Sequence, residues 1–310
     1  TNSSGAGRYD LWACKLDGAG NIQWQKTYGG PKDDGSEDYQ SCIRQTPDGG
    51  YIFVGCTASS GAGRSDVWVL RLDAAGAIFW QKTYGGTELD RGTAVAVCSD
   101  GGFAVAGFTY SFGVGKSDIW VLKLKADGTV AWQFTYGTAP TASIPRADGY
   151  DGVNGIEETA TGDLLVTGSC HRTAMLMALT PAGAKRWVVS YGGPGAMTRV
   201  RGAATTSDQG YVLAGGSGKC RIRKVSAAGA TTWEKSYSGA GLKYGTAVDQ
   251  TPDGGYIAAA FGLTADGRQS TASLLRLDST GGVVWCRSYG GTSLDHFSSV
   301  SACPDGTYVV

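Results

Sequence analysis

The sequence predicts an all-β protein built from repeated four-stranded antiparallel units, and three observations support this. The 310 residues include 50 glycines, roughly twice the average share, and these follow no three-residue period. One heptapeptide, WQKTYGG, begins at Trp24 and again at Trp80. Short runs rich in β-branched and aromatic residues alternate with Asp-Gly turns, and no helical period competes with them.

The heptapeptide defines the length of the repeat. Its copies and near-copies begin at Trp24, Trp80, Trp132, Trp187, Trp233 and Trp285. Subtracting successive positions gives spacings of 56, 52, 55, 46 and 52 residues. A period near fifty residues with β-type content is typical of a propeller or a repeat array.

Each repeat contains the signals for four strands, here named A to D. The "DGG" in PDGGYIFVG and the "D-x-x-G" before each Trp read as hairpin turns. For the first complete repeat we expect strand A at 38–46, B at 51–57, C at 66–72 and D at 78–84. A four-stranded meander of this kind is one propeller blade.

Six copies predict a single domain over residues 1–310, a six-bladed β-propeller of four-stranded antiparallel blades. The segment TNSSGAGRYDLW at Thr1 matches TASSGAGRSDVW at Thr57, and PDGTYVV near the C-terminus matches PDGGYIF at Pro47. We therefore expect the last blade to take strands C and D from the N-terminus and strands A and B from the C-terminus. Such closure removes an exposed sheet edge.

The pattern DGGYIFVG…SDVWVLRLDAAGAIFWQKTYGG resembles the repeat of secreted or cell-surface propellers of bacteria and archaea. More loosely, LDAAGAIFW is similar to the tryptophan-docking motif of quinoprotein propellers, which is a packing device that does not bind the quinone. Those enzymes typically have eight blades rather than six. The resemblance implies a propeller fold and an extracellular or cell-surface location, and it implies no particular chemistry. The opening residues TNSSGAGRYD have neither the charged nor the apolar region of a signal peptide, so a signal peptide is expected to be absent or already removed.

Composition excludes several functional classes. Lys+Arg 27 against Asp+Glu 27 leaves no basic excess for nucleic acid, and no apolar run is long enough to span a membrane. With two histidines and no HExxH or paired CxxC motif, no metal site is predicted. No cofactor is predicted either. Calcium in the acidic loop PKDDGSED at Pro31 is an alternative to a simple solvated loop.

The repeat varies most where strand A begins, which is the expected mouth of the central channel. The two variable positions hold Asp38, Asp90, Asp151, Thr198, Lys243 and Asp295, and then Tyr39, Arg91, Gly152, Arg199, Tyr244 and His296. Binding sites on ring-shaped folds gather on one face, from loops on a rigid scaffold. These residues are therefore expected either to line a polar ligand site of mixed charge, for a sugar or a carboxylate, or to be solvated loop residues.

Two further features have both a functional and a structural interpretation. Trp12, Trp68 and Trp120 share one position in strand C and form a candidate partner surface, or else reflect uneven drift of the repeat. Among the eight cysteines, Cys170 and Cys220 end and begin strands of successive blades on the same face, and they are a candidate disulfide.

These features favour a non-enzymatic binding or interaction module for a polar ligand, a glycan or a protein partner. One alternative is a hydrolase or lyase that uses the channel-mouth aspartates as acid and base with Arg91, Arg199 or His296. Another is a self-assembling subunit of a surface layer, sheath or filament.

Overall fold

The protein is described here from a computed structural model. It describes residues 5–7, 9–18, 20–35, 41–114, 117–137, 152–170, 173–191, 197, 199–239, 241–263, 269–291 and 295–310. Every regular element in this part of the chain is a β-strand. By packing, the chain divides into two compact units, Thr1–Val166 with Leu179–Ala184, and Thr167–Ala178 with Lys185–Val310.

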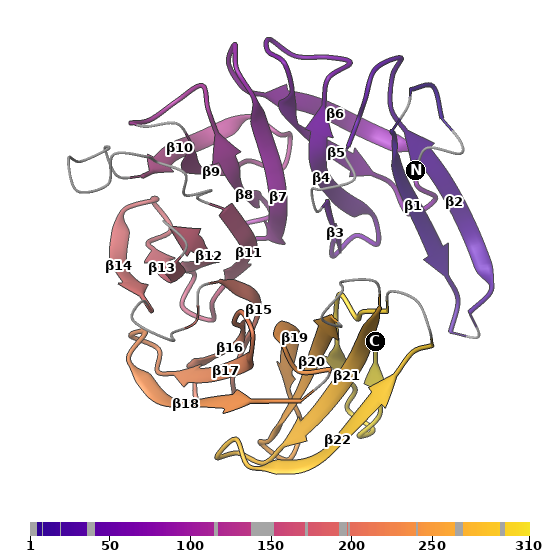
Figure 1. Ribbon diagram of the computed structural model, residues 1–310. Coiled ribbons are helices and arrows are strands. Elements are labelled where there is room, and N and C mark those ends of the chain that lie inside the picture. Colours follow the sequence, from indigo (N-terminus) through magenta and orange to yellow (C-terminus); the bar gives the residue numbers. More distant parts are fainter. Residues whose placement is uncertain are drawn as a thin grey trace. The chain divides into compact units, whose positions relative to one another are not determined.

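The described residues form five four-stranded antiparallel sheets, each a meander of consecutive strands (Figure 1). The first is β3 (Cys42–Gln45), β4 (Tyr51–Thr57), β5 (Asp66–Leu72) and β6 (Ile78–Tyr84). The second is β7 (Asp90–Val97), β8 (Phe103–Thr109), β9 (Asp118–Leu124) and β10 (Val130–Tyr136). The third is β11 (Gly152–Glu158), β12 (Leu164–Cys170), β13 (Thr173–Leu179) and β14 (Lys185–Ser190). The fourth is β15 (Val200–Thr205), β16 (Tyr211–Gly215), β17 (Cys220–Val225) and β18 (Thr231–Tyr237). The fifth is β19 (Tyr244–Gln250), β20 (Tyr256–Leu263), β21 (Ser270–Leu277) and β22 (Val283–Tyr289).

Two further sheets have two strands each. They are β1 (Leu11–Leu16) with β2 (Ile22–Tyr28), and β23 (Ser301–Ala302) with β24 (Tyr308–Val309). The predicted β-propeller of four-stranded antiparallel blades is thus confirmed. The two short sheets are the strands that the sequence assigns to the sixth blade, C and D from one end and A and B from the other.

Asp-Gly turns fix the hairpins within each blade. Gly49, in the turn between β3 and β4, has φ +84°, a conformation that favours glycine. The Asp48 carboxylate accepts hydrogen bonds from the Thr46 hydroxyl at 2.6 Å and the Gly50 N–H at 3.3 Å. The carboxylate therefore holds the turn in place from within.

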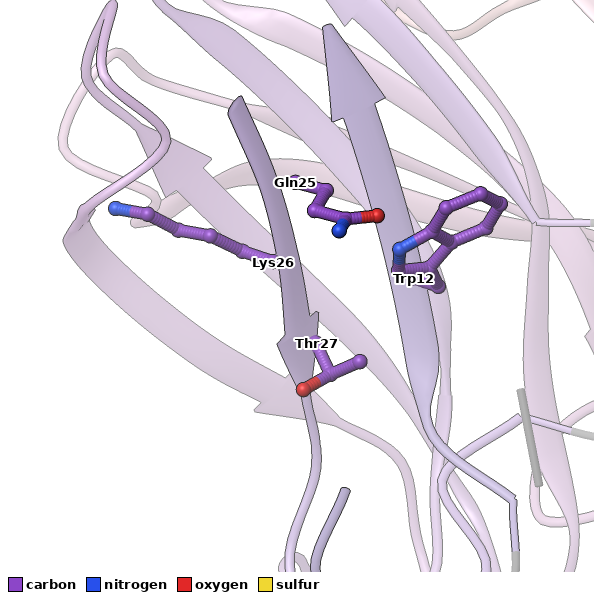
Figure 2. Close-up of a pocket in the computed structure, with 4 residues that line it drawn as sticks. All are labelled: Trp12, Gln25, Lys26 and Thr27. Atoms are coloured by element: carbon purple, nitrogen blue, oxygen red, sulfur yellow. The ribbon is translucent and has the colours of Figure 1, made fainter. Parts of the chain in front are cut away.

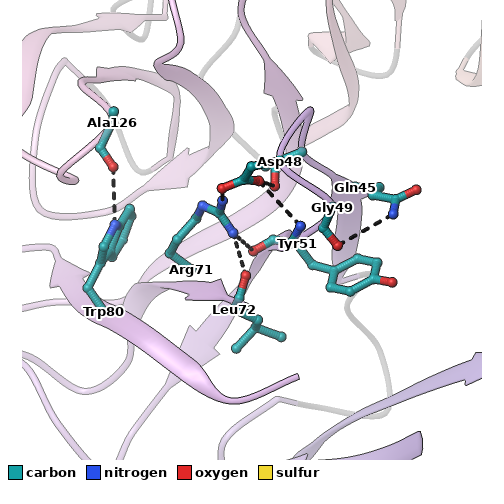
Figure 3. A network of polar contacts seen from close by, with 10 residues as sticks. Gln45, Asp48, Gly49, Tyr51, Arg71, Leu72, Trp80 and Ala126 are labelled. Atoms are coloured by element: carbon teal, nitrogen blue, oxygen red, sulfur yellow. Dashed lines mark hydrogen bonds and ion pairs between the residues drawn. The ribbon is translucent and has the colours of Figure 1, made fainter. Parts of the chain in front are cut away.

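The same carboxylate ties the turn to strand C. In Figure 3 the Arg71 guanidinium lies between Asp48 and the carbonyl oxygens of Tyr51 and Leu72. Equivalent ion pairs recur in three other blades, and they are Lys123–Asp100, Lys224–Asp208 and Arg276–Asp253. A buried basic side chain in strand C thus locks the A–B turn of its own blade.

The heptapeptide forms hydrogen bonds between successive blades. The Trp80 indole donates a hydrogen bond to the Ala126 carbonyl at 3.1 Å (Figure 3), and the Tyr84 hydroxyl donates one to the Gly128 carbonyl at 2.5 Å. A Cβ on Gly128 would lie 2.9 Å from the Trp80 ring, so only glycine leaves room for the docked indole. The tyrosine bond recurs from Tyr28, Tyr136, Tyr191 and Tyr237.

Apolar cores lie between neighbouring blades. Trp68 packs with Leu11, Ala13 and Tyr28 of the preceding sheet. Trp120 packs in the same way with Val54 and Val67. Trp68 and Trp120 therefore belong to the core, because each is covered by the blade that precedes it.

Candidate functional site

Asp90, one of the predicted channel-mouth residues, is a structural carboxylate. It is fully buried at the start of β7. One oxygen accepts hydrogen bonds from the Thr109 hydroxyl and the Ser111 N–H, and the other from the Gly86 N–H at 2.8 Å and the Ser111 hydroxyl at 2.6 Å. Both carboxylate oxygens are therefore occupied by hydrogen bonds that connect the loop before β7 with the end of β8 and the residues after it. Asp90 is not available to a ligand.

Asp34, rather than Asp38, is the equivalent of Asp90 in the preceding blade, which corrects the sequence alignment. Asp34 is also fully buried and accepts hydrogen bonds from the Gly30 N–H, the Thr57 hydroxyl and Ser59. It lies four residues after Gly30, as Asp90 lies four after Gly86, and the chain then carries four extra residues before strand A. Asp38, Tyr39 and Asp151 lie outside the described residues.

The first glycine of the pair in the heptapeptide is explained by these carboxylates. A Cβ on Gly85 would lie 1.9 Å from Asp66 Oδ1 and 2.9 Å from Asp90 Oδ2. Burial raises the pKa of Asp66, hydrogen bonds from the Gly63 and Ala62 N–H groups oppose this rise, and the charge of Asp90 adds to it. Only a residue without a side chain fits between the two acids.

Asp295 has the same role at the equivalent position. Its carboxylate accepts a hydrogen bond from the Gly291 N–H at 2.8 Å, again four residues earlier. Its backbone N–H and carbonyl oxygen both bond to the Ser270 hydroxyl, each at 2.6 Å. Asp295 therefore positions the chain that presents the next residue, His296.

A cluster of cationic and aromatic side chains gathers in the C-terminal unit, from β15, β19, β20 and the segment after β22. The Tyr244 ring stacks on the Phe261 ring, with centroids 5.0 Å apart and planes inclined by 27°. The Arg201 guanidinium carbon lies 5.2 Å from the Tyr244 ring centre and 5.8 Å from that of Phe261. The His296 ring centre lies 5.9 Å from that of Phe261. We call Arg201, Tyr244, Phe261 and His296 the arginine–aromatic cluster.

The strand register explains how these residues meet. Tyr244 and Phe261 are direct partners across the β19–β20 pair. Arg201 lies at an irregularity of register in β15, between Val200 and Gly202, and β15 neighbours β19 of the next blade. The bulge therefore turns Arg201 toward the following blade, as general bulge geometry allows.

Positive charge is concentrated at this cluster. Burial lowers the pKa of Arg201, and the charge of Arg199 lowers it further, while Tyr244 opposes the change. Lys243 donates from Nζ to the Leu263 carbonyl oxygen. None of the ion pairs formed among the described residues includes Arg199, Arg201 or Lys243. The cluster is chemically suited to an anion with an adjacent flat surface.

Of the predicted channel-mouth residues, the structure therefore brings Tyr244 and His296 together around Phe261, with Arg199 near Arg201. Arg201 and Phe261 were not predicted. One sequence feature could have indicated Arg201: the equivalent positions of two other repeats hold threonine, Thr93 and Thr246, so a long cationic side chain here departs from the repeat. Arg91 lies in the other unit, where it pairs with Phe108 across β7 and β8.

The predicted tryptophan surface is wrong for two of its three members. Trp68 and Trp120 are buried, whereas Trp12 is 52% exposed. Trp12 borders a hollow of about 460 Å³ with Gln25, Lys26 and Thr27. Figure 2 shows the Gln25 amide reaching toward Trp12 and Lys26 extending away from it. The difference arises because Trp68 and Trp120 each pack against the preceding sheet.

The predicted Cys170–Cys220 disulfide is not formed, because Cys220 is a free, buried thiol. Cys220 belongs to the core shared with Val248, Ala260 and Leu275 of the following blade. Its sulfur therefore faces away from the blade that carries Cys170, whose side chain is outside the described residues. Burial raises the pKa of Cys220 to about 12.

Metal binding has little support in the described part of the chain. No group of three or more His, Cys, Asp and Glu side chains gathers there in a way that could hold an ion. In the acidic loop for which calcium was the alternative interpretation, the Asp34 carboxylate is engaged by the hydroxyl and N–H donors named above. The described residues also contain no helix with the length and apolarity needed to cross a membrane.

The chain matches no protein-family model and no curated protein. Among solved structures it is similar to a protein of unknown function from Bacteroides caccae, with a TM-score of 0.52 and 14% identity over 92% of this chain and 97% of that one. It is also similar to a "putative 6-phosphogluconolactonase" from Bacteroides uniformis, with a TM-score of 0.55 and 13% identity over 85% and 75% of the two chains. A third similarity is to Kuenenia stuttgartiensis hydrazine synthase, with a TM-score of 0.52 and 14% identity over 78% and 64%. Likenesses at this identity support the propeller fold alone.

Proposed function

We propose that this propeller is a binding module whose site is the arginine–aromatic cluster and whose ligand is a sugar that carries a carboxylate. One observation carries the proposal. Arg201 lies over a stacked Tyr244–Phe261 pair, next to a second arginine, and forms no ion pair with a described acid. We further propose, from the resemblance of the repeat, that the protein acts outside the cell or at its surface.

The cluster offers two complementary features to such a ligand. Guanidinium groups bind carboxylates through paired N–H donors, and they do so strongly where water is partly excluded. Arg201 and Tyr244 are both half-buried, whereas Arg199 and His296 are exposed and open to solvent. A pyranose ring can lay its C–H face on an aromatic ring while its carboxylate reaches Arg201, since the ring face carries negative charge density.

A catalytic role is the second candidate, because an exposed imidazole stands at the same cluster. His296 could accept a proton from the carbon next to a carboxylate held by Arg201, and the electron pair left behind would expel the glycosidic oxygen on the next carbon of an oligosaccharide, which leaves as an alcohol after taking a proton from water. Such a reaction would release an unsaturated product that absorbs in the ultraviolet. Its appearance would identify the protein as an enzyme, and its absence with binding intact would support the binding module.

The test is a calorimetric titration of the full chain with glucuronate and galacturonate, with glucose as the uncharged comparison. We expect binding of the acids and much weaker binding of glucose. Charge-assisted hydrogen bonds contribute about 1.5–3 kcal/mol, so Arg201→Gln should weaken binding on the order of 10- to 100-fold. Tyr244→Leu should weaken both acids through loss of stacking.

The matched control is Arg287→Gln. Arg287 also lies over an aromatic ring, that of Trp285 at 5.6 Å, but outside the cluster. This variant should bind the acids as the wild type does. Equal weakening by Arg201→Gln and Arg287→Gln, or equal affinity for glucose and glucuronate, contradicts the proposal.

A further inference from the structure

A second cavity lies between the fourth and fifth blades, within the C-terminal unit. It measures about 550 Å³, in the range of small-molecule sites. One wall is the end of β18 and the loop after it, and the other is formed by β21 and β22 (Figure 1). Its lining residues are Ser236, Tyr237, Ser238, Gly239, Gly241, Leu242, Ser273, Leu275, Val283, Cys286 and Ser288.

The cavity lies where other blade interfaces are filled by a large side chain. Trp68 pairs with Thr83 across β5 and β6, and Ser273 pairs with Ser288 across β21 and β22, so Ser273 stands at the tryptophan position. Trp68 and Trp120 pack against the preceding blade from this position. Ser273 is nevertheless fully buried, because its hydroxyl lies 3.1 Å from that of Ser288 and Gly241 of the loop after β18 packs directly against it. The loop therefore takes up part of the volume that an indole fills elsewhere, and the hollow lies beside it.

The neighbouring position is also reduced in size. Cys286 pairs with Leu275 as Gln81 pairs with Leu70, so a thiol replaces a longer amide side chain. In the fourth blade the two positions hold Arg221 and Glu234, which fill the space as an ion pair at 2.8 Å. Among the described pairs, Ser273 with Cys286 is thus the smallest combination, and the cavity follows from it.

The lining determines the class of ligand. No charged side chain lines the cavity, so an ionic ligand would have no partner for its charge. Leu242 and Val283 supply apolar contacts, and the exposed hydroxyls of Ser236, Ser238 and Ser288 and the Cys286 thiol supply hydrogen-bonding groups. The Tyr237 hydroxyl already donates to the Gly281 carbonyl at 2.7 Å.

We propose that this cavity binds an uncharged aromatic ring with a hydroxyl or N–H group, of the phenol or indole class. Such a ring would lie beside the buried Ser273, in the part of the indole volume that the loop after β18 leaves open. Its apolar edges contact Leu242 and Val283, and its polar group bonds to the exposed hydroxyl of Ser236, Ser238 or Ser288. This site shares no residue with the arginine–aromatic cluster, and its lining is uncharged whereas that cluster is cationic.

The test is titration of the full chain with phenol, indole and glucose, followed by calorimetry and by the melting temperature. We expect saturable binding of phenol and indole, with a rise in melting temperature, and no binding of glucose. Cys286→Gln restores the side chain that other blades carry and should weaken indole by ~10-fold or more, because a difference of ~1.4 kcal/mol changes affinity tenfold. Ser273→Trp should abolish binding.

Two further measurements keep the test decisive. Indole should slow the alkylation of Cys286, mapped by peptide mass spectrometry, which reports on the site even if Ser273→Trp fails to fold. Arg201→Gln should bind indole as the wild type does, which separates this site from the proposed sugar-acid site. Binding of glucose in place of the aromatic probes, no binding of either, or unchanged indole affinity in Cys286→Gln would overturn the proposal.

Discussion

The environment of a repeated tryptophan depends on which blade precedes it. Trp12, Trp68 and Trp120 share a position in strand C, yet Trp68 is 6% exposed and Trp12 is 52% exposed. Trp68 is covered by Leu11, Ala13 and Tyr28, which come from a different repeat. Single residues of this chain therefore cannot be assigned to core or surface from their own repeat alone.

Trp68→Ala is expected to lower the free energy of unfolding by about 3–5 kcal/mol, as for other buried aromatic residues. Trp12→Ala is the matched control at the same repeat position, and it should cost about 1 kcal/mol or less because half of the side chain is already exposed. Urea denaturation of both variants measures the difference. Equal losses would contradict the burial of Trp68 against the preceding sheet.

Asp90 shows how a residue type can suggest a site and yet serve the fold. The variant Asp90→Ala leaves the buried Thr109 hydroxyl and the Gly86 N–H without acceptors, so we expect a loss of about 2–5 kcal/mol. Asp295→Ala, at the equivalent but less buried position, should lose less. Denaturation of the two variants checks this order, and a stable Asp90→Ala protein would show that the carboxylate is dispensable.

At the scale of elements, the A–B turn and strand C form one unit through their ion pair. In the fourth blade the hydrogen bond from Lys224, and then that from the Thr206 hydroxyl, lower the pKa of Asp208 from 3.8 to about 2. A carboxyl whose pKa is lowered on folding stabilises the folded state above its unfolded pKa and loses this contribution in acid. The turn should therefore loosen on acidification.

The stability difference between the wild type and Asp208→Asn is accordingly expected to be constant above pH 3.8 and to shrink as the pH falls toward 2. Urea denaturation at a series of pH values measures it. Lys224→Met removes the largest cause of the lowered pKa, so in that background the pH dependence of the difference should become smaller, while the hydrogen bonds from Thr206 and Gly210 remain. A difference that grows in acid would contradict the lowered pKa.

The strands themselves follow closely from the sequence. Strands B, C and D of the first complete blade were predicted at 51–57, 66–72 and 78–84, and β4, β5 and β6 have these bounds. The Asp-Gly turns fix them locally. The sequence alignment chose Asp38 as the equivalent of Asp90, whereas the structure shows that it is Asp34. The alignment failed because this repeat has four extra residues before strand A. The hydrogen bonds of Asp34 with Gly30, Thr57 and Ser59 identify the correct position.

The candidate site was predictable only in part. Tyr244 and His296 could be chosen because they vary at a position that faces the expected channel. Arg201 and Phe261 could not, since Arg201 reaches the cluster through a register irregularity and Phe261 through its pairing with Tyr244 across two strands. Contacts between repeats depend on local irregularities of this kind, and an alignment of the repeats does not show them.

At the scale of the whole molecule, closure of the propeller is still a prediction from the sequence. Deleting residues 1–17 removes β1, which ends at Leu16, and should leave the sixth blade incomplete with an exposed edge. We expect aggregation or a large loss of stability, measured by size-exclusion chromatography and thermal unfolding. A well-folded monomer after this deletion would contradict closure by the two ends of the chain.

The charge of the molecule also acts at this scale. The formal net charge is zero, so an anionic ligand is attracted by Arg199 and Arg201 locally rather than by the protein as a whole. Binding at the cluster should therefore weaken with added salt only moderately, because the half-buried Arg201 acts at short range while only the exposed Arg199 is fully screened.

A crystal structure of the full chain soaked with galacturonate tests the central claim most directly. It should place the sugar ring against Tyr244 and Phe261, with its carboxylate on Arg201, and the Arg201→Gln crystal soaked in parallel should lack the ligand. A sugar bound elsewhere on the chain, or held equally well in the Arg201→Gln crystal, would contradict the assignment of the arginine–aromatic cluster as the binding site.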